Sequence, residues 1–307
     1  MPVNIVLRIV GWIWLMDHVN FVSSTGQIVN IVGTRKAQYK EFPYSVVFIS
    51  RSSNKPVSMG SVITGDKILS AAHSFYQLKD GAQVQIAANR LYAVGGSRFT
   101  TANEIGYEKR SLNSIKSHPD IKWLEHTVLN DIAVVYLFEP FKINDYVKPL
   151  SVFSTSTDVF KKKWYSLGES KIECDGLRFG VVSSTSNISF VNNNAFLKAT
   201  RVRFLPQEDC QKLYPEIGEE FRKGYIYCVT SKYSNESMCV GDPGSSLQCE
   251  GNVYAIFIKS KGCGEHTQPA LYLSLENYII MFGLSGQNNI LNSFIITFLS
   301  LLVSMCF

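Results

Sequence analysis

Short runs of apolar and β-branched residues recur along the middle of the chain, separated by small or turn-forming residues. Runs of about four to eight such residues at short intervals are typical of all-β sandwiches and barrels. The clearest runs are YSVVFIS (44–50), SVIT (61–64), AQVQIAA (82–88), IAVVYLF (132–138), LKATRVRF (197–204) and VYAIFIK (253–259). We therefore expect an all-β fold, with one helix near SLENYIIMF at 274–282.

The amino-terminal end differs from this pattern. Residues 4–15, NIVLRIVGWIWL, form a short apolar run that small and polar residues follow. Such a run is typical of a secretory signal peptide, here with a cleavage site near Ser24. The alternative is a buried strand at the edge of the domain.

The carboxyl-terminal end is also distinct, because residues 290–307 carry no charge and follow a small, polar stretch at 283–289. A small-residue site, a spacer and an apolar tail are typical of a GPI-anchor signal, with Ser285 or Gly286 as the attachment residue. A membrane helix is the alternative, although this run is slightly short for one. A third interpretation is a buried extension of the domain.

Length and composition indicate an ordinary globular protein. The chain has 307 residues, of which 46% are hydrophobic and 18% charged, enough for one large domain or two small ones. The net charge of +5 comes from scattered basic residues, and the densest run is Lys161, Lys162 and Lys163. We interpret this run as a solvated loop and expect no nucleic-acid partner. We also expect no metal ion and no cofactor.

The cysteines point to an oxidising compartment. Of seven cysteines, Cys306 lies in the tail and the other six lie between residues 174 and 263. An even number of cysteines together with a signal peptide favours disulfides and a secreted protein. The sequons at Asn187 and Asn235 predict N-glycosylation, which agrees with secretion.

Four motifs occur in a fixed order along the chain, namely IVGT (31–34), SAAHS (70–74), NDIAVV (130–135) and GDPGSSL (241–247). Together they resemble the mature amino terminus and the histidine, aspartate and serine motifs of chymotrypsin-like serine peptidases, family S1. The resemblance implies two packed six-stranded antiparallel β-barrels with a cleft between them and a short C-terminal helix.

The resemblance covers about residues 31–282 and divides the chain into segments. We expect a signal peptide at 1–24, a short leader at 25–30, an S1-like domain at 31–282, a spacer at 283–289 and an apolar tail at 290–307.

For the cysteines, the resemblance implies three bridges, Cys174–Cys249, Cys210–Cys228 and Cys239–Cys263. The family's usual bridge beside the catalytic histidine is missing, because both of its positions, Ser58 and Ser74, are serine in this chain.

The resemblance makes His73 the general base and Asp131 the residue that orients it. Asp131 could instead be a loop aspartate satisfied by backbone N–H groups. Pro243 stands where the nucleophilic serine belongs, and proline has neither a hydroxyl nor a backbone N–H. The family's oxyanion hole uses that N–H and the one of Gly241, so the substitution removes both the nucleophile and a donor.

Ser245 is the nearest candidate for a substitute nucleophile. Its Cα is about 6–7 Å further along the chain. A catalytic hydrogen bond to His73 needs about 2.6–3.2 Å. We therefore expect a catalytically inactive homologue, and keep an active endopeptidase that uses Ser245 as the alternative.

Other positions also depart from the family pattern. Ile258 replaces a serine that helps to hold the catalytic aspartate, and Lys259 and Ser260 replace the usual Trp and Gly at the substrate-binding edge. Ser237 lies at the base of the expected specificity pocket, and Ala270 narrows it. These changes together indicate that peptide cleavage is no longer required of this cleft.

The activation switch is altered as well. Ile31 and Asp242, whose pairing activates family members, are both present, but Asn30 replaces the basic residue at the cleavage site. The sequence therefore predicts a secreted protein, with or without an anchor at the outer cell surface. We expect it to bind an extracellular protein, such as an active protease or its substrate.

Overall fold

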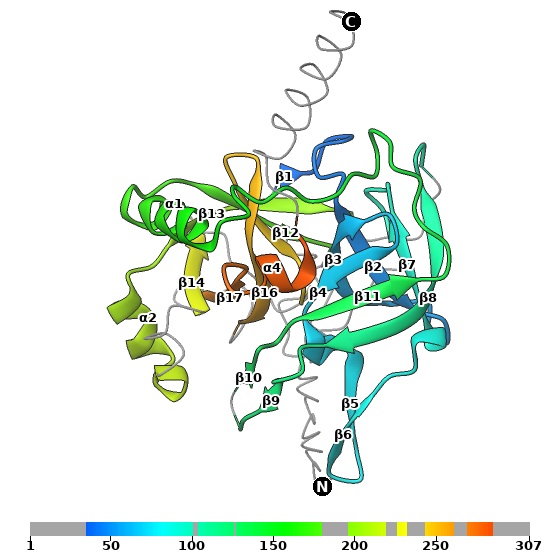
Figure 1. Cartoon of the computed structure of the whole chain (residues 1–307), viewed down its shortest axis with the longest axis horizontal. Helices are drawn as coiled ribbons and strands as arrows, with labels where there is room; N and C mark the ends of the chain where they lie inside the picture. The colour runs from blue at the N-terminus through cyan, green and yellow to red at the C-terminus, as the bar shows by residue number, and fades with distance from the viewer. Residues whose placement is uncertain are drawn as a thin grey trace, which may run out of the picture.

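The computed structural model describes residues 35–100, 104–125, 127–179, 196–218, 226–231, 243–260 and 269–284. Within these ranges the chain forms two antiparallel β-barrels packed side by side (Figure 1). The expectation of an all-β, double-barrel fold is confirmed.

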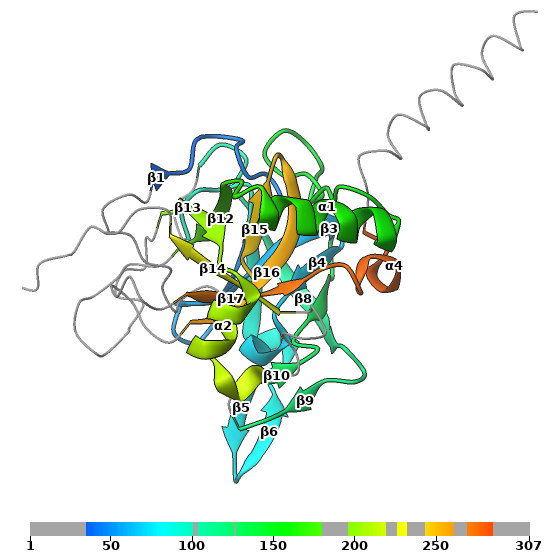
Figure 2. The same cartoon turned by 90° about the vertical axis from the view of Figure 1, so that its left-hand side faces the viewer.

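The first barrel closes in the order β11-β4-β3-β2-β7-β8. Its strands are β2 (Ser45–Ser50), β3 (Pro56–Thr64), β4 (Lys67–Ser70), β7 (Leu91–Gly95), β8 (Glu108–Ser117) and β11 (Ala133–Leu137). Two small hairpins extend from it, β5 (Tyr76–Lys79) with β6 (Ala82–Gln85), and β9 (Lys122–Trp123) with β10 (Val128–Leu129). Both views show the β5–β6 hairpin projecting from the body of the molecule (Figures 1 and 2).

The second barrel is built from a sheet in the order β1-β13-β12-β15-β16-β17-β14, and a β13–β14 pairing closes six of these strands. The strands are β1 (Arg35–Lys36), β12 (Cys174–Arg178), β13 (Lys198–Phe204), β14 (Ile226–Ser231), β15 (Ser246–Cys249), β16 (Asn252–Ser260) and β17 (Ala270–Ser274).

Helical segments are short and lie at the edges of the barrels. The α-helices are α1 (Thr157–Glu169), α2 (Gln207–Leu213) and α4 (Ile279–Phe282), and the 3-10 turns are η1 (Ala72–Phe75), η2 (Ala88–Arg90) and η3 (Pro215–Ile217). Within the ranges described, no helix is both long and apolar enough to cross a membrane.

Continuous apolar runs appear where a strand is buried on both faces. In β2, Val46 and Phe48 belong to the core of the first barrel, whereas Val47 and Ile49 pack into the larger core of the second barrel and the contact between the two. Successive side chains of a strand point to opposite faces, so both faces must be covered to bury all four.

Helix α1 corrects one expectation from the sequence. Lys161, Lys162 and Lys163 lie on this helix and not in a loop. The helix forms because Phe160, Trp164 and Leu167 recur at helical spacing and are all buried. Lys162 is exposed, whereas Lys161 and Lys163 are half-buried, and Lys163 pairs with Glu250 at 2.6 Å.

The carboxyl-terminal helix is shorter than expected. Residues 274–282 were expected to be helical, but Ser274 ends β17 and only Ile279–Phe282 form α4. Gly283 ends the helix in a left-handed conformation with φ 62°, and Leu284 packs back into the core with 3% of its surface exposed.

Two of the three expected bridges are present in the structure. Cys174–Cys249 joins β12 to the end of β15, and Cys210–Cys228 joins α2 to β14. The third pair, Cys239 and Cys263, lies outside the described residues. Bridges of this kind fit an oxidising, extracellular compartment.

Candidate active site

His73 lies on η1, directly after the end of strand β4. Ala71 and Ala72 precede it and are fully buried, so the turn packs closely against the barrel. The His73 side chain keeps 29% of its surface exposed, whereas only 4% of the Asp131 side chain is exposed. The histidine therefore stands at the surface with the aspartate behind it.

Asp131 holds His73 at two points. Its Oδ1 accepts a hydrogen bond from the His73 backbone N–H at 2.8 Å, and its Oδ2 lies 2.6 Å from His73 Nδ1. Because an ionised carboxylate only accepts hydrogen bonds, Nδ1 carries the proton and Nε2 is the atom that could take one from a reactant. The structure thus brings together the two residues expected to form the base and its orienting group.

Three effects act on the pKa of His73. Burial alone would lower this pKa, but the charge of Asp131 and its hydrogen bond more than offset burial and raise it above its usual range. The nearby charge of Lys259 opposes that rise. The ring is therefore held ready to accept a proton.

Pro243 is fixed by contacts with the opposite barrel. Its carbonyl oxygen accepts hydrogen bonds from Met59 N at 2.9 Å and from Ser58 Oγ at 2.8 Å. Ser58, one of the two serines at the position of the expected bridge, thus contacts the residue that stands at the expected nucleophile position. The Oγ atom of Ser74, the other serine, is buried without a hydrogen-bond partner among the described residues.

The two serines that follow Pro243 lie inside the protein. Ser245 is 1% exposed, and its carbonyl accepts a hydrogen bond from Phe257 N at 2.7 Å. Ser246 is also 1% exposed, and its hydroxyl pairs with that of Ser61 in the first barrel. In the part of the chain that the structure describes, the His73 ring hydrogen-bonds only to Asp131.

Strands β16 and β17 carry the other substituted positions. Ile258 is buried at an irregularity in the pairing of these strands, and half-buried Lys259 follows it. Ser260 and Ala270 are direct partners in the ladder, and both are buried. The structure therefore places the two described residues of the expected specificity pocket side by side.

Several expected site residues lie outside the described part of the chain. They are Asn30 and Ile31 of the activation switch, Ser237, Gly241 and Asp242 around the serine motif, the sequon residues Asn187 and Asn235, and Ser285 and Gly286 of the tail.

Sequence reasoning missed a hollow beside α1. Trp164 and Tyr165 of α1 line a hollow together with Phe204 and Tyr227 of the second barrel. The helical spacing of apolar residues in 157–169 was the available signal. Among the described residues, no cluster of His, Cys, Asp and Glu could hold a metal ion.

Comparison with known proteins agrees with this geometry. Rat serine protease 1 is 27% identical over 251 residues, which cover 81% of this chain and 87% of the relative. Pig trypsin is 25% identical over 254 residues, covering 81% of this chain and 92% of the relative.

A solved structure shares the fold. Neuropsin, a serine protease expressed in the limbic system of mouse brain, superimposes with a TM-score of 0.62 at 17% identity, over 81% of this chain and 97% of neuropsin. The family model described as trypsin matches residues 31–280. With its double barrel and its His73–Asp131 pair, this chain belongs to the trypsin family of serine peptidases.

Proposed function

We propose that this protein is a catalytically inactive member of the trypsin family that acts by binding another protein outside the cell. The observation that carries the proposal is the environment of Pro243, whose carbonyl is held by Met59 N and Ser58 Oγ. A residue without hydroxyl or N–H occupies the place after Gly241-Asp242 where a nucleophile is needed.

The chemical cost of this substitution is large. Without a nucleophile, a site of this kind retains only about 10³–10⁴-fold rate enhancement over water. Losing one oxyanion donor costs a further factor of about 10²–10³. A correctly oriented His73 does not replace the missing hydroxyl, because a general base activates a nucleophile and does not itself form the covalent intermediate.

The alternative, an active enzyme that uses Ser245, finds little support in the surroundings of that residue. A nucleophile must meet the substrate, yet Ser245 is 1% exposed and its backbone pairs with Phe257 inside the second barrel. The His73 side chain, by contrast, is 29% exposed.

We further propose that the protein is secreted and that its apolar tail is a GPI-anchor signal, which is removed when a GPI group is attached to Ser285 or Gly286 at the outer cell surface. Phosphatidylinositol-specific phospholipase C, applied to intact expressing cells, should then release the protein. Full retention with Cys306 still detectable by mass would contradict the GPI anchor and favour a membrane helix.

A fluorophosphonate probe tests the absence of catalysis directly, because it reacts with an activated serine. We expect no labelling of the purified protein under conditions in which pig trypsin is fully labelled. Labelling that disappears in Ser245→Ala would refute the proposal and establish the active alternative. Hydrolysis of peptide esters should be absent in the same samples.

A further inference from the structure

We propose that the hollow between α1 and α2 is a binding site for an acidic peptide segment of a partner protein, one that carries a large apolar side chain beside its carboxylates. The inference rests on the proposed function only for the nature of the occupant. It does not depend on whether the His73–Asp131 site is active, because neither residue lines the hollow.

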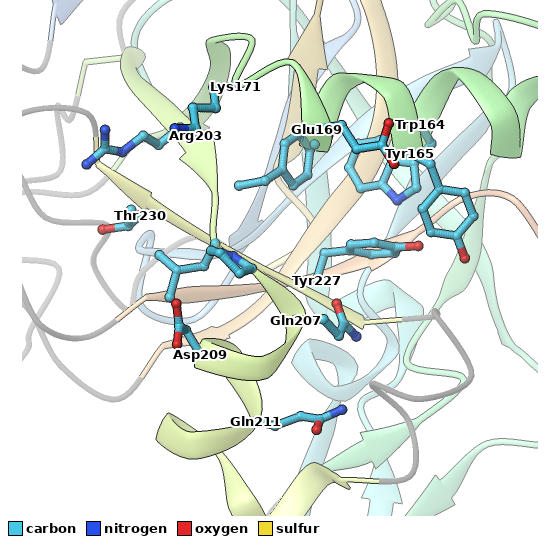
Figure 3. Close-up of a pocket in the computed structure, with 14 residues that line it drawn as sticks. Trp164, Tyr165, Glu169, Lys171, Arg203, Gln207, Asp209, Gln211, Tyr227 and Thr230 are labelled. Carbon is cyan, nitrogen blue, oxygen red and sulfur yellow. The ribbon is translucent and has the colours of Figure 1, made fainter.

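The hollow is large enough for several side chains. Its volume is about 1110 Å³, slightly above the range of about 300–1,000 Å³ that is common for ligand pockets. Helix α1, strands β13 and β14 and the start of α2 surround it (Figure 3).

Aromatic rings form the apolar part of the hollow. Trp164 packs edge to face against Phe204 and Tyr227, with ring centroids 4.6 Å and 4.9 Å apart. Phe204 and Tyr227 are half-buried, and Tyr165 is 43% exposed, so this aromatic surface is not fully covered by the protein itself. An apolar surface with a polar rim is typical of an interaction site.

The charges at the rim favour an acidic occupant. Lys171 and Arg203 lie at the same end of the hollow (Figure 3), both are exposed, and neither forms an ion pair with a described residue. The carboxylate of Asp209 is already paired with Lys212 at 3.1 Å. Glu169 is the other carboxylate of the lining, so with Lys212 counted beside Asp209 three cations face two carboxylates at the rim.

The backbone at Lys171 adopts a conformation that favours glycine. Lys171 comes directly after Ser170, the C-cap of α1, with φ 52°, a left-handed position at a helix end that glycine normally occupies. The Ile172 N–H donates to Leu167 O across this turn, at 3.3 Å. The chain thus keeps a lysine at the hollow where glycine would suit the backbone better.

This backbone conformation provides a sharp test. Lys171→Gly removes the charge and also relieves the left-handed strain, so its melting temperature should be unchanged or higher. Any loss of binding in this variant therefore cannot come from misfolding. Arg203→Gln removes the second charge, and Arg90→Gln, an exposed arginine on the first barrel, is the matched control.

The probe is a phage library of random dodecapeptides, selected on the purified full chain. We expect enrichment of peptides that place an aromatic residue or leucine close to Asp or Glu. Their affinity, measured by fluorescence anisotropy, should fall at least about tenfold for Lys171→Gly and for Arg203→Gln, and stay unchanged for Arg90→Gln.

Three outcomes would overturn the inference. They are no enrichment, binding that is equally strong to the Lys171→Gly and Arg203→Gln variants, and enrichment of acidic peptides without a large apolar residue. The last would mean that the surface binds polyanions in general. Fluorophosphonate labelling of the same preparation separates this inference from the proposed lack of catalysis. Protein that is labelled and still binds the peptides would refute only the lack of catalysis.

Discussion

Replacing Gly244 by alanine tests whether the loop at Pro243 is packed as described. Gly244 has φ 84°, a left-handed conformation that costs a residue with a Cβ about 1–2 kcal/mol. A methyl group there would meet Ser70 Oγ and Met59 O, and would lie 2.8 Å from Ala71 N. Two of these neighbours are backbone atoms, so the loop itself must move, and such overpacking costs about 1–3 kcal/mol.

Gly251→Ala separates the two contributions. Gly251 has φ 79°, but a methyl group there would find nothing within 4 Å. Both variants lose the same backbone freedom in the unfolded chain, so the difference between them measures packing alone. We expect Gly244→Ala to be less stable than Gly251→Ala by about 1–3 kcal/mol. For a domain of this size that corresponds to about 2–4 °C in melting temperature per kcal/mol.

Circular dichroism during thermal unfolding measures the stability of the two variants, and urea unfolding gives a second measure. Equal stability of the two alanine variants would mean that Gly244 does not approach β3 and β4. The position assigned to Pro243, and with it the account of the missing nucleophile, would then be wrong.

Three further predictions concern the site and its surroundings. Pro243→Ser should restore little peptide hydrolysis, with a turnover at least about 10²-fold below that of pig trypsin, because Ile258 still gives Asp131 no hydrogen bond. Near-normal turnover would contradict a site altered at several points. Asp131→Asn should lower the pKa of His73, because burial then acts without the opposing carboxylate, and an unchanged pKa in an NMR titration of the ring would refute this. Burial raises the pKa of Glu276, and the charge of Lys161 opposes this rise. Because the folded state then binds the proton more tightly than the unfolded chain, the folded state loses stability as pH rises from the ordinary glutamate pKa to the raised one. In urea unfolding, Glu276→Gln should therefore be more stable than the parent protein at neutral pH but not at about pH 4. A stability difference that is the same at both pH values would contradict a raised pKa for Glu276.

Much of the fold was predictable because its signals are local. Strand β16 reads as a continuous apolar run, and all of its residues except Lys259 are buried. The four motifs likewise singled out His73 and Asp131, the latter directly before the predicted strand 132–138, and the structure has the two side chains in contact. Order along the chain and strand burial were enough for these features.

Helix α1 was missed because its charge pattern dominated the interpretation. Three consecutive lysines suggested a loop, while the buried positions Phe160, Trp164 and Leu167 carry the helical period. At the other end, the predicted helix was too long because Glu276 and its neighbours form a turn that buries a carboxyl group, which propensity alone does not foresee.

The contact between Ser58 and Pro243 could not have been predicted from the sequence. These residues lie far apart in the chain and on different barrels, and only the packing of the two brings Ser58 Oγ to the Pro243 carbonyl. The hollow between α1 and α2 could not have been predicted either, because its walls come from separate segments of the chain.

The bond from Met59 N–H to the Pro243 carbonyl has a consequence for dynamics. Met59 belongs to β3 of the first barrel, yet its amide proton is held by an acceptor in the second. In amide hydrogen exchange, this proton becomes accessible when the contact between the Pro243 loop and β3 opens, whereas amides paired between β2 and β3 follow the opening of their own barrel. The Met59 amide therefore provides an intrinsic reporter of how firmly the Pro243 loop of the second barrel is docked on the first.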